Sequence, residues 1–318
     1  MTHEDMESIL TFDLAIDAVE GAYKAAGRGE AVMPSKLYLE LPDRRGDFRA
    51  MPAFVFGWAG VKWVNVHPEN PSRGLPTVMA TLVLNQPETG FPLAIMDATA
   101  ITDYRTGAAG AVAVKHLAPT GAKTLGFVGA GAQAKALFFA ILRIFRPERA
   151  IAWSRSGKVA WLEGLDIGVK IELGSLEEAA SCDVVCTATP SRRPLVEDRW
   201  VKRNSLIVAV GADAPGKEEL DPGVLKRAKV IVDDVDQAVH SGEINVPIAA
   251  GIMRKSDIHA TIGEVLAGLK KGREGEETIV FDSTGIAIQD VALAATVYDA
   301  AKKQGLGSEV ELIGKSLI

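Results

Sequence analysis

The chain has 318 residues, a length that favours two domains of ordinary size. Hydrophobic residues make up 47% and charged residues 24%, which excludes a disordered, collagenous or disulfide-stapled protein. The 35 lysines and arginines against 41 acidic residues leave a net charge of −6, so the chain lacks the general basic character of proteins that bind nucleic acid or anionic membranes.

No apolar run reaches the roughly 18 residues that a membrane-spanning helix needs. The N-terminal segment MTHEDMESIL is not a basic stretch followed by an apolar core, as a secretory signal would be. The only two cysteines, Cys182 and Cys186, lie together in an apolar segment, and the five histidines show no metal-ligand spacing. We therefore expect a cytoplasmic protein without a disulfide framework, a metal site, or nucleic-acid and membrane partners.

The first stretch, to about residue 116, mixes helices with short strands. Residues 11–29 have apolar positions at helical spacing, with Thr11 as the N-cap and Gly27 as the terminator. A second helix, rich in alanine and glycine and suited to close packing on a sheet, is expected over 102–118. Between them, apolar and β-branched runs predict strands at 35–41, 47–56, 60–66, 76–85 and 91–98, the last two joined by a QPETG turn.

The second stretch, 117–288, changes to strand–helix alternation. Short apolar runs predict strands at 124–129, 150–156, 169–173, 183–190, 206–212, 229–234 and 278–283, separated by expected helices at 132–145, 175–181, 221–228 and 258–272. This alternation indicates a parallel sheet covered on both faces, so we predict the α/β class. A third stretch consists of a helix over 287–305 and a short strand-like tail.

A glycine-rich turn opens the second stretch. The run TLGFVG leads through Gly129-Ala-Gly131-Ala-Gln-Ala134 into a long helix, which is a G-x-G-x-x-A variant of the dinucleotide fingerprint. Gly129 permits the tight turn, Gly131 lets a pyrophosphate approach the backbone, and Ala134 lets the helix pack closely on the strand. The free N–H groups and positive dipole end of the helix favour phosphate. We therefore predict a dinucleotide site rather than an ordinary glycine turn.

The end of the next strand indicates which dinucleotide binds. An NAD site usually has Asp or Glu about 20 residues after the glycine turn, where it holds the ribose hydroxyls. Here the position is Ser154, 23 residues after Gly131, within the segment Ser154-Arg155-Ser156. Without an acid, and with a guanidinium, this segment suits a 2′-phosphate, which favours NADP over NAD. The alternative is that Arg155 is only a solvated loop residue.

Three basic side chains lie in the strand-like runs of the first stretch. Alternation places Lys62 on one face with Val64 and Val66, an unfavourable position for an ammonium unless something binds it. Partial burial lowers the pKa of a lysine, which suits Lys62 to proton transfer near neutral pH. Lys36 and Arg49 lie in neighbouring runs, where either can pair with a carboxylate. A solvated sheet face with alternating charges is the alternative for all three.

These motifs together resemble the ornithine cyclodeaminase/mu-crystallin family over nearly the whole chain, most closely its branch of archaeal-type alanine dehydrogenases. The matches follow one another in order along the chain, which makes the resemblance specific at family level. They are MPSK (33–36), RAMP (49–52), GVKWVN (60–65), GLPT (74–77), RTGAAG (105–110), GAGAQ (129–133), GADAPGKEEL (211–220), GEIN (242–245), IGE (262–264) and DSTG (282–285).

The resemblance implies a fold, an activity and an assembly. It implies a Rossmann dinucleotide-binding domain over 117–288 and an α+β substrate and dimerisation domain built from 1–116 and 289–318. The activity it implies is that of an NAD(P)-dependent oxidoreductase acting on the α-carbon of a small amino or imino acid, of the alanine dehydrogenase or imine reductase type. The assembly it implies is a homodimer.

The resemblance also assigns roles to single residues. Lys62 corresponds to the family's active-site lysine and Asp213 to the aspartate that cyclodeaminases use as acid/base and amine partner. Lys36 and Arg105 fall near the substrate carboxylate and the nicotinamide. Family members contact the dinucleotide at positions that correspond here to Thr77, Arg105, Ala132, Gln133, Ser154, Lys217 and Ser283, to which we add Thr187.

The chain departs from the family pattern at two places. Cyclodeaminases have an acid at position 49 that grips the distal amine of ornithine, whereas Arg49 argues against ornithine and fits a second carboxylate contact. The Ser154-Arg155 pair replaces the acid of the NAD-dependent archaeal branch and resembles the NADPH-using ketimine reductases. Two alternatives therefore stay open: a cyclodeaminase that releases ammonia without net redox change, and a cofactor-loaded binding protein of the crystallin type.

Overall fold

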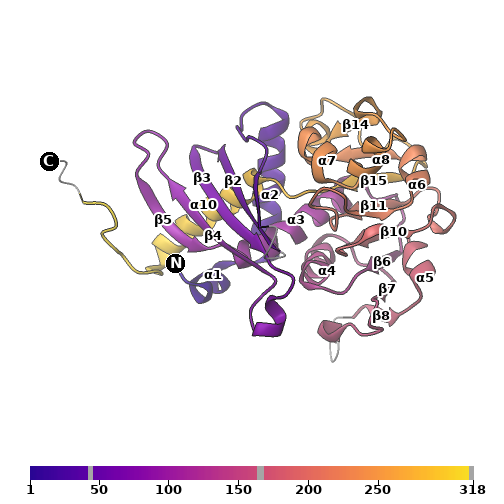
Figure 1. Cartoon of the computed structure of the whole chain (residues 1–318), viewed down its shortest axis with the longest axis horizontal. Coiled ribbons are helices and arrows are strands. Elements are labelled where there is room, and N and C mark those ends of the chain that lie inside the picture. Colours follow the sequence, from indigo (N-terminus) through magenta and orange to yellow (C-terminus); the bar gives the residue numbers. More distant parts are fainter. Residues whose placement is uncertain (42–45, 163–167, 315–318) are drawn as a thin grey trace.

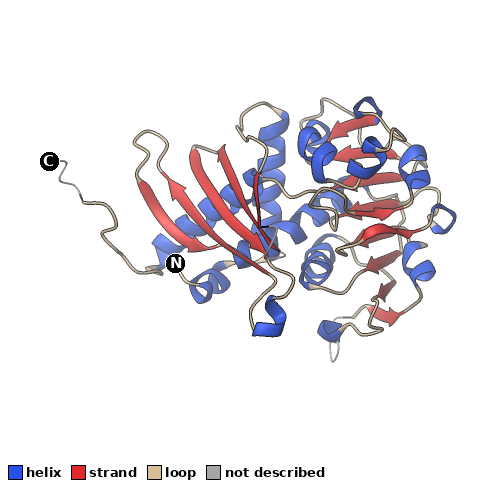
Figure 2. Ribbon diagram, viewed as in Figure 1, coloured by secondary structure: helices blue, strands red, loops and turns tan. Residues whose placement is uncertain are grey.

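The computed structural model describes residues 1–41, 46–162 and 168–314. Two main sheets lie side by side along the long axis of the molecule, with the N-terminus and the last helix of the chain beside the smaller one (Figure 1). Helices pack on both sheets, as the view coloured by secondary structure shows (Figure 2). This mixed, Rossmann-like architecture with a parallel sheet confirms the predicted α/β class. Within the described residues, no helix is long and apolar enough to cross a lipid bilayer.

The smaller sheet is antiparallel and has the order β1-β2-β3-β4-β5. Because side chains alternate across a strand, Lys62 and Val64 are buried on one face while Trp63 on the other face is 43% exposed. The prediction that Lys62 shares a buried face with a valine is therefore confirmed. The strands are β1 (Leu37–Leu41), β2 (Gly46–Val55), β3 (Trp58–Val66), β4 (Val78–Asn85) and β5 (Pro92–Asp97), with a short 3-10 helix (Asn70–Arg73) before β4.

Helices cover the face of this sheet that carries Lys62. The C-terminal helix α10 (Ala287–Gln304) packs on β2, β3 and β4, and α2 (Phe12–Gly27) packs on α10. The short helix α1 (His3–Ile9) lies against α10 and β5. Both α2 and α10 have the predicted bounds, and the Thr11 hydroxyl caps α2 by accepting the N–H of Leu14.

The larger sheet is parallel throughout and has the order β14-β13-β15-β11-β9-β6-β7-β8. The chain runs outward through β7 and β8 and then returns to β9 on the other side of β6. In open parallel sheets, ligands bind at the carboxyl ends of the strands where the order reverses in this way. The strands are β6 (Thr124–Val128), β7 (Arg149–Trp153), β8 (Lys170–Leu173), β9 (Val184–Thr187), β11 (Leu206–Ala209), β13 (Lys229–Val232), β14 (Ile258–Thr261) and β15 (Ile279–Asp282).

A long helix joins the two sheets. Helix α3 (Thr99–Leu117) leads from β5 to β6 and packs on α4 (Ala132–Ile144), the helix that follows the glycine turn. The approach is so close that a Cβ at Gly107 would lie 2.5 Å from the carbonyl oxygen of Ala136, which explains the small residues of α3. The remaining helices are α5 (Leu176–Ala180), α6 (Pro222–Arg227), α7 (Val235–Ser241), α8 (Asn245–Ala249) and α9 (Ile262–Leu266), with 3-10 turns at Ala160–Leu162, Asp198–Trp200 and Lys255–Asp257.

Parts of the predicted pattern are wrong. The sequence predicts a helix over 258–272, but the first four of these residues form the strand β14. The helix α9 starts only at Ile262, because Thr261 and Glu264 form a capping box there. The tail has no strand over its described residues 306–314, and residues 315–318 lie outside the described part. A parallel pair, β10 (Arg192–Val196) and β12 (Glu218–Leu220), forms a small separate sheet that the sequence did not indicate.

Candidate active site

A buried ion pair lies on the covered face of the smaller sheet. Lys62 of β3 donates from Nζ to Asp290 Oδ1 of α10 at 2.7 Å, and both side chains are fully buried. The hydroxyl of Thr102 lies 3.3 Å from the same nitrogen. Burial lowers the pKa of Lys62 to about 7, although the carboxylate of Asp290 opposes this shift. A lysine with this pKa both donates and accepts a proton near neutral pH.

Arg105 of α3 shares Asp290 with Lys62. Its Nε lies 3.2 Å from Asp290 Oδ1, and its Nη1 donates to Gln289 Oε1 at 3.2 Å. The guanidinium also packs against the backbone at Gly285, where φ is +76° and a Cβ would collide with Nη1. Two cations therefore face one carboxylate, and the excess positive charge favours an additional anion such as a substrate carboxylate.

Lys36 reaches across to the larger sheet. It precedes β1, and its Nζ donates to the carbonyl oxygen of Thr284, in the loop after β15, at 2.7 Å. Among the described residues, its hydrogen-bond acceptors are the carbonyl oxygens of Thr284 and Gly285, with no carboxylate at ion-pair distance. Burial, and then the charge of Arg49, lower the pKa of Lys36 to about 8. A buried ammonium held only by neutral groups is well suited to bind a carboxylate.

Arg49 of β2 binds two carboxylates and thereby links the sheets. Its Nε and Nη2 donate to Asp47 at 2.7 and 3.1 Å, and its Nη1 donates to Asp213 at 2.7 Å. Asp213 lies in the loop after β11 and also pairs with Lys217. Burial raises the pKa of Asp213, but Arg49, Lys217 and Lys36 outweigh burial and hold this pKa well below its usual range. A carboxylate held ionised in this way is a poor proton donor near neutral pH, so the geometry does not favour the predicted acid/base role of Asp213.

Asp233, which no sequence motif singled out, holds the loop after β15. Its carboxylate accepts the N–H of Gly285 at 2.7 Å and the hydroxyls of Thr284 and Ser283 at 3.1 and 3.3 Å. Burial raises the pKa of Asp233 to about 6, while the ammonium of Lys36 opposes the rise. Its position directly after an apolar strand of a parallel sheet is the signal that points to such a residue.

The glycine turn lies at the carboxyl end of β6, beside the point where the strand order reverses. Gly129 has a φ of +116°, and a Cβ there would lie 2.6 Å from the carbonyl oxygen of Ala188, so the position requires glycine. Gly131 is the N-cap of α4, with open space where its Cβ would be, and the following Ala132 is exposed. Gly131 has no side chain with which to cap α4, so the first N–H groups of the helix are available to a pyrophosphate. These residues fit a dinucleotide.

The predicted ribose-binding segment forms a tight turn after β7. Ser154 Oγ donates to the carbonyl oxygen of Lys158 at 2.7 Å and accepts the N–H of Lys158 at 3.1 Å. Arg155 and Lys158 are exposed, and residues 154–158 include no acid. The turn therefore presents positive charge beside the dinucleotide-binding end of β6.

The other residues predicted to contact the dinucleotide differ in burial and in the hydrogen bonds that they already make. Thr187, at the end of β9, is fully buried, and its hydroxyl donates to Glu219 at 2.6 Å, so the hydroxyl is already engaged. Gln133 donates to Asp103 at 2.6 Å, which ties the first turn of α4 to α3. Thr77 lies just before β4 and is half-buried. The predicted residues that meet at the junction of the two sheets are Lys36, Arg49, Lys62, Arg105, Asp213, Lys217 and Ser283.

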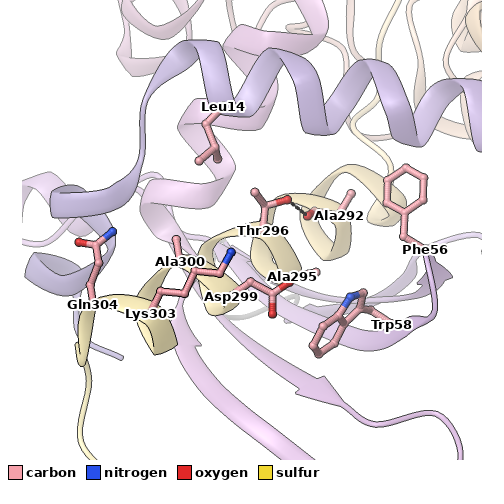
Figure 3. Close-up of a pocket in the computed structure, with 10 residues that line it drawn as sticks. All are labelled: Leu14, Phe56, Trp58, Ala292, Ala295, Thr296, Asp299, Ala300, Lys303 and Gln304. Atoms are coloured by element: carbon pink, nitrogen blue, oxygen red, sulfur yellow. Dashed lines mark hydrogen bonds between the residues drawn. The ribbon is translucent and has the colours of Figure 1, made fainter.

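A separate hollow of about 430 Å³ lies between α2, α10 and the turn that joins β2 to β3 (Figure 3). Phe56, Trp58 and Asp299 are among the residues that line it. None of the predicted site residues belongs to its lining. The charged junction is therefore distinct from this surface feature.

The fold and the junction define a dinucleotide-binding α/β protein with a charged centre between its two sheets. The chain belongs to the ornithine cyclodeaminase/mu-crystallin family, whose model matches residues 1–305. The family resemblance seen in the sequence is thus confirmed.

The similarity to known proteins extends over almost the whole chain. The alanine dehydrogenase of Archaeoglobus fulgidus is 50% identical over 317 residues, which cover 98% of this chain and 97% of the relative. The structure of an archaeal alanine dehydrogenase dimer with bound NAD has a TM-score of 0.95 at 50% identity, with 98% of each chain covered. The Δ1-pyrroline-2-carboxylate reductase of Thermococcus litoralis, in complex with NADH and L-proline, has a TM-score of 0.93 at 33% identity, covering 98% of this chain and 99% of the other.

Proposed function

We propose that this protein is an NAD(P)-dependent oxidoreductase that interconverts a small amino acid and the corresponding imino acid at the α-carbon, as alanine dehydrogenases and imine reductases do. The observation that carries the proposal is the buried Lys62–Asp290 pair on the covered face of the smaller sheet, with Arg105 and Lys36 beside it. Lys36 in turn contacts the loop after β15, in the sheet that carries the glycine turn. The bound nicotinamide supplies or accepts the hydride.

The residues of the chain have separate tasks in this proposal. Lys62 exchanges a proton at Nζ with the substrate nitrogen, since its pKa lies near 7. Lys36 and Arg105 bind the substrate carboxylate, and both are only 8% exposed, so water competes little for these charges. Arg49 makes a second carboxylate contact through the Nη2 hydrogen that Asp47 leaves free.

We propose NADP(H) as the preferred cofactor, although the two related structures contain NAD and NADH. The support is local: Ser154 stands where an acid would repel a 2′-phosphate, and Arg155 and Lys158 are exposed in the same turn. The dinucleotide contacts assigned to Thr77, Gln133, Lys217 and Ser283 belong to this proposal.

We further propose a homodimer, with 1–116 and 289–318 as the substrate and dimerisation domain and 117–288 as the dinucleotide domain. The face of the smaller sheet opposite Lys62 carries exposed apolar side chains, among them Leu39, Trp63 and Ile95, and an archaeal relative at 50% identity is a dimer. Sedimentation is expected to give a dimer and to give a monomer for Trp63→Glu. An active monomer in the parent protein would contradict this assembly.

A substrate panel with both cofactors tests the activity. Small amino acids with oxidised cofactor, and cyclic imines or 2-oxo acids plus ammonia with reduced cofactor, are expected to change the absorbance of the reduced nicotinamide. A cyclodeaminase would release ammonia from a diamino acid without a net change in that absorbance. A binding protein would hold the cofactor and give neither signal. Either of these two results would overturn the proposal.

A further inference from the structure

We propose that Asp290 is a positioning residue of the reaction, which holds the Lys62 ammonium and the Arg105 guanidinium together and keeps Lys62 protonated for the reduction of the imino acid. The inference rests on the proposed function, because it concerns the proton that Lys62 exchanges. Neither the motifs nor the family resemblance assigned a role to Asp290.

One oxygen of Asp290 serves both cations. Oδ1 lies 2.7 Å from Lys62 Nζ and 3.2 Å from Arg105 Nε. The second oxygen, Oδ2, is buried and has no hydrogen-bond partner among the described residues. Buried polar atoms in folded proteins are almost always paired, so the unused carboxylate oxygen beside the two cations calls for a role beyond the pairing with Lys62.

The carboxylate is held in a fixed place. Asp290 lies in the first turn of α10, where the free N–H groups and the helix dipole favour an anion. The preceding residue, Gln289, donates to Tyr23 Oη at 2.5 Å and accepts from Arg105, so the same turn is anchored on two sides. Asp290 therefore cannot follow Lys62 if that side chain moves, and it determines where the ammonium rests.

Asp290 also opposes the groups that lower the pKa of Lys62. Burial lowers the pKa of Lys62, and the charges of Arg105 and Lys36 lower this pKa further. Among these neighbours, only the Asp290 carboxylate raises it. Thr102, the remaining polar contact, carries no charge. Without Asp290, Lys62 would be mostly neutral at pH 7 and would have no proton to give to the substrate nitrogen.

Asp290→Asn, which keeps the size of the side chain and removes its charge, tests the inference. In the parent, kcat for imine reduction is expected to fall as pH rises through the pKa of Lys62. In Asp290→Asn this falling limb should move about 1–2 pH units lower, with a loss of about 5- to 50-fold at pH 7 that is largely regained at lower pH. Cofactor binding, followed by tryptophan fluorescence, should be unchanged.

Glu20→Gln is the matched control. Glu20 is a buried acid of α2 that pairs with Lys24 of the same helix and with Lys115 in the last turn of α3. Among the described residues, it makes no ion pair with either cation that Asp290 holds. Its loss removes an acid that pairs with two half-exposed lysines and should leave the limb of the pH profile in place. If both variants lower kcat equally at every pH, Asp290 has only a structural role and the inference is wrong.

Two further variants keep the test decisive if Asp290→Asn does not fold. Asp290→Glu keeps the charge, so the falling limb of its kcat–pH profile should stay near that of the parent even if kcat is lower. A limb displaced by more than one pH unit in this variant would overturn the inference. In Lys62→Met/Asp290→Asn both charges are removed together, and kcat should equal that of Lys62→Met alone. A parent protein without turnover on any amino or imino acid would instead overturn the proposed function itself.

Discussion

The two sheets contribute to the junction in different ways. The smaller sheet supplies charged side chains from within its strands, such as Arg49 and Lys62, aimed by the alternation of an antiparallel sheet. The larger sheet supplies turns and loops that follow its strands, such as Gly129, Asp213 and Asp233, because a parallel sheet presents free backbone groups at its carboxyl end. In the proposed function, the smaller sheet therefore controls the chemistry on the substrate, and the larger one controls which dinucleotide binds.

The largest expected effect follows from Lys62→Met, which tests the chemical side of this division. The methionine keeps most of the side-chain volume and removes the ammonium, so the loss of proton transfer should lower kcat by about 10²- to 10⁴-fold. Cofactor affinity should stay at the parental value, because the glycine turn belongs to the other sheet. Steady-state kinetics with a parallel cofactor titration measure both quantities. Turnover at the parental rate would remove Lys62 from the mechanism.

Ser154→Asp tests the dinucleotide side. The new carboxylate would repel a 2′-phosphate and accept hydrogen bonds from the ribose hydroxyls, so the ratio of the affinities for NADPH and NADH should change by about 10- to 100-fold towards NADH. The kcat with saturating cofactor should change little. Fluorescence titration with both reduced cofactors provides the measurement. Equal affinities for the two cofactors in the parent would contradict the proposed preference.

Arg49→Lys tests the link between the sheets. A lysine keeps the charge but cannot hold Asp47 and Asp213 at once, as the guanidinium does. The substrate KM should rise about tenfold while kcat changes less, because the lost contact acts equally on bound substrate and transition state. A fall in kcat alone would place Arg49 in the chemical step.

The smallest expected effect concerns the pH profile of Asp213→Asn. Because the neighbouring cations keep the pKa of Asp213 far below neutrality, this carboxylate stays ionised between pH 5 and 9. The fall of kcat for imine reduction with rising pH should therefore stay at the parental pH, because the pKa of Lys62 sets it. The kcat for amino-acid oxidation should rise over the same pH range. A limb displaced by a unit or more would identify Asp213 as the titrating group after all.

Much of the fold was predictable because it depends on local patterns. The Thr11 cap, the strands of the smaller sheet and the glycine turn before α4 are all visible in the order of residue types. The boundary at Ile262 was missed although its signal, the capping box of Thr261 and Glu264, is also local. The β10–β12 pair was missed because its strands are short and gain their stability from each other across a long separation in sequence.

The sequence by itself determined the α/β class, the family, the dinucleotide turn at Gly129 and the buried face of Lys62. The class and the family follow from the order of patterns along the chain, and the turn and the buried face follow from spacing within one segment. Only the tertiary structure decided the partners of the charges: that Lys62 meets Asp290, and that Arg49 meets Asp213. The physical reason is that these partners lie 228 and 164 residues apart, so their distance, their burial and the resulting pKa shifts exist only once the two sheets and α10 have packed together.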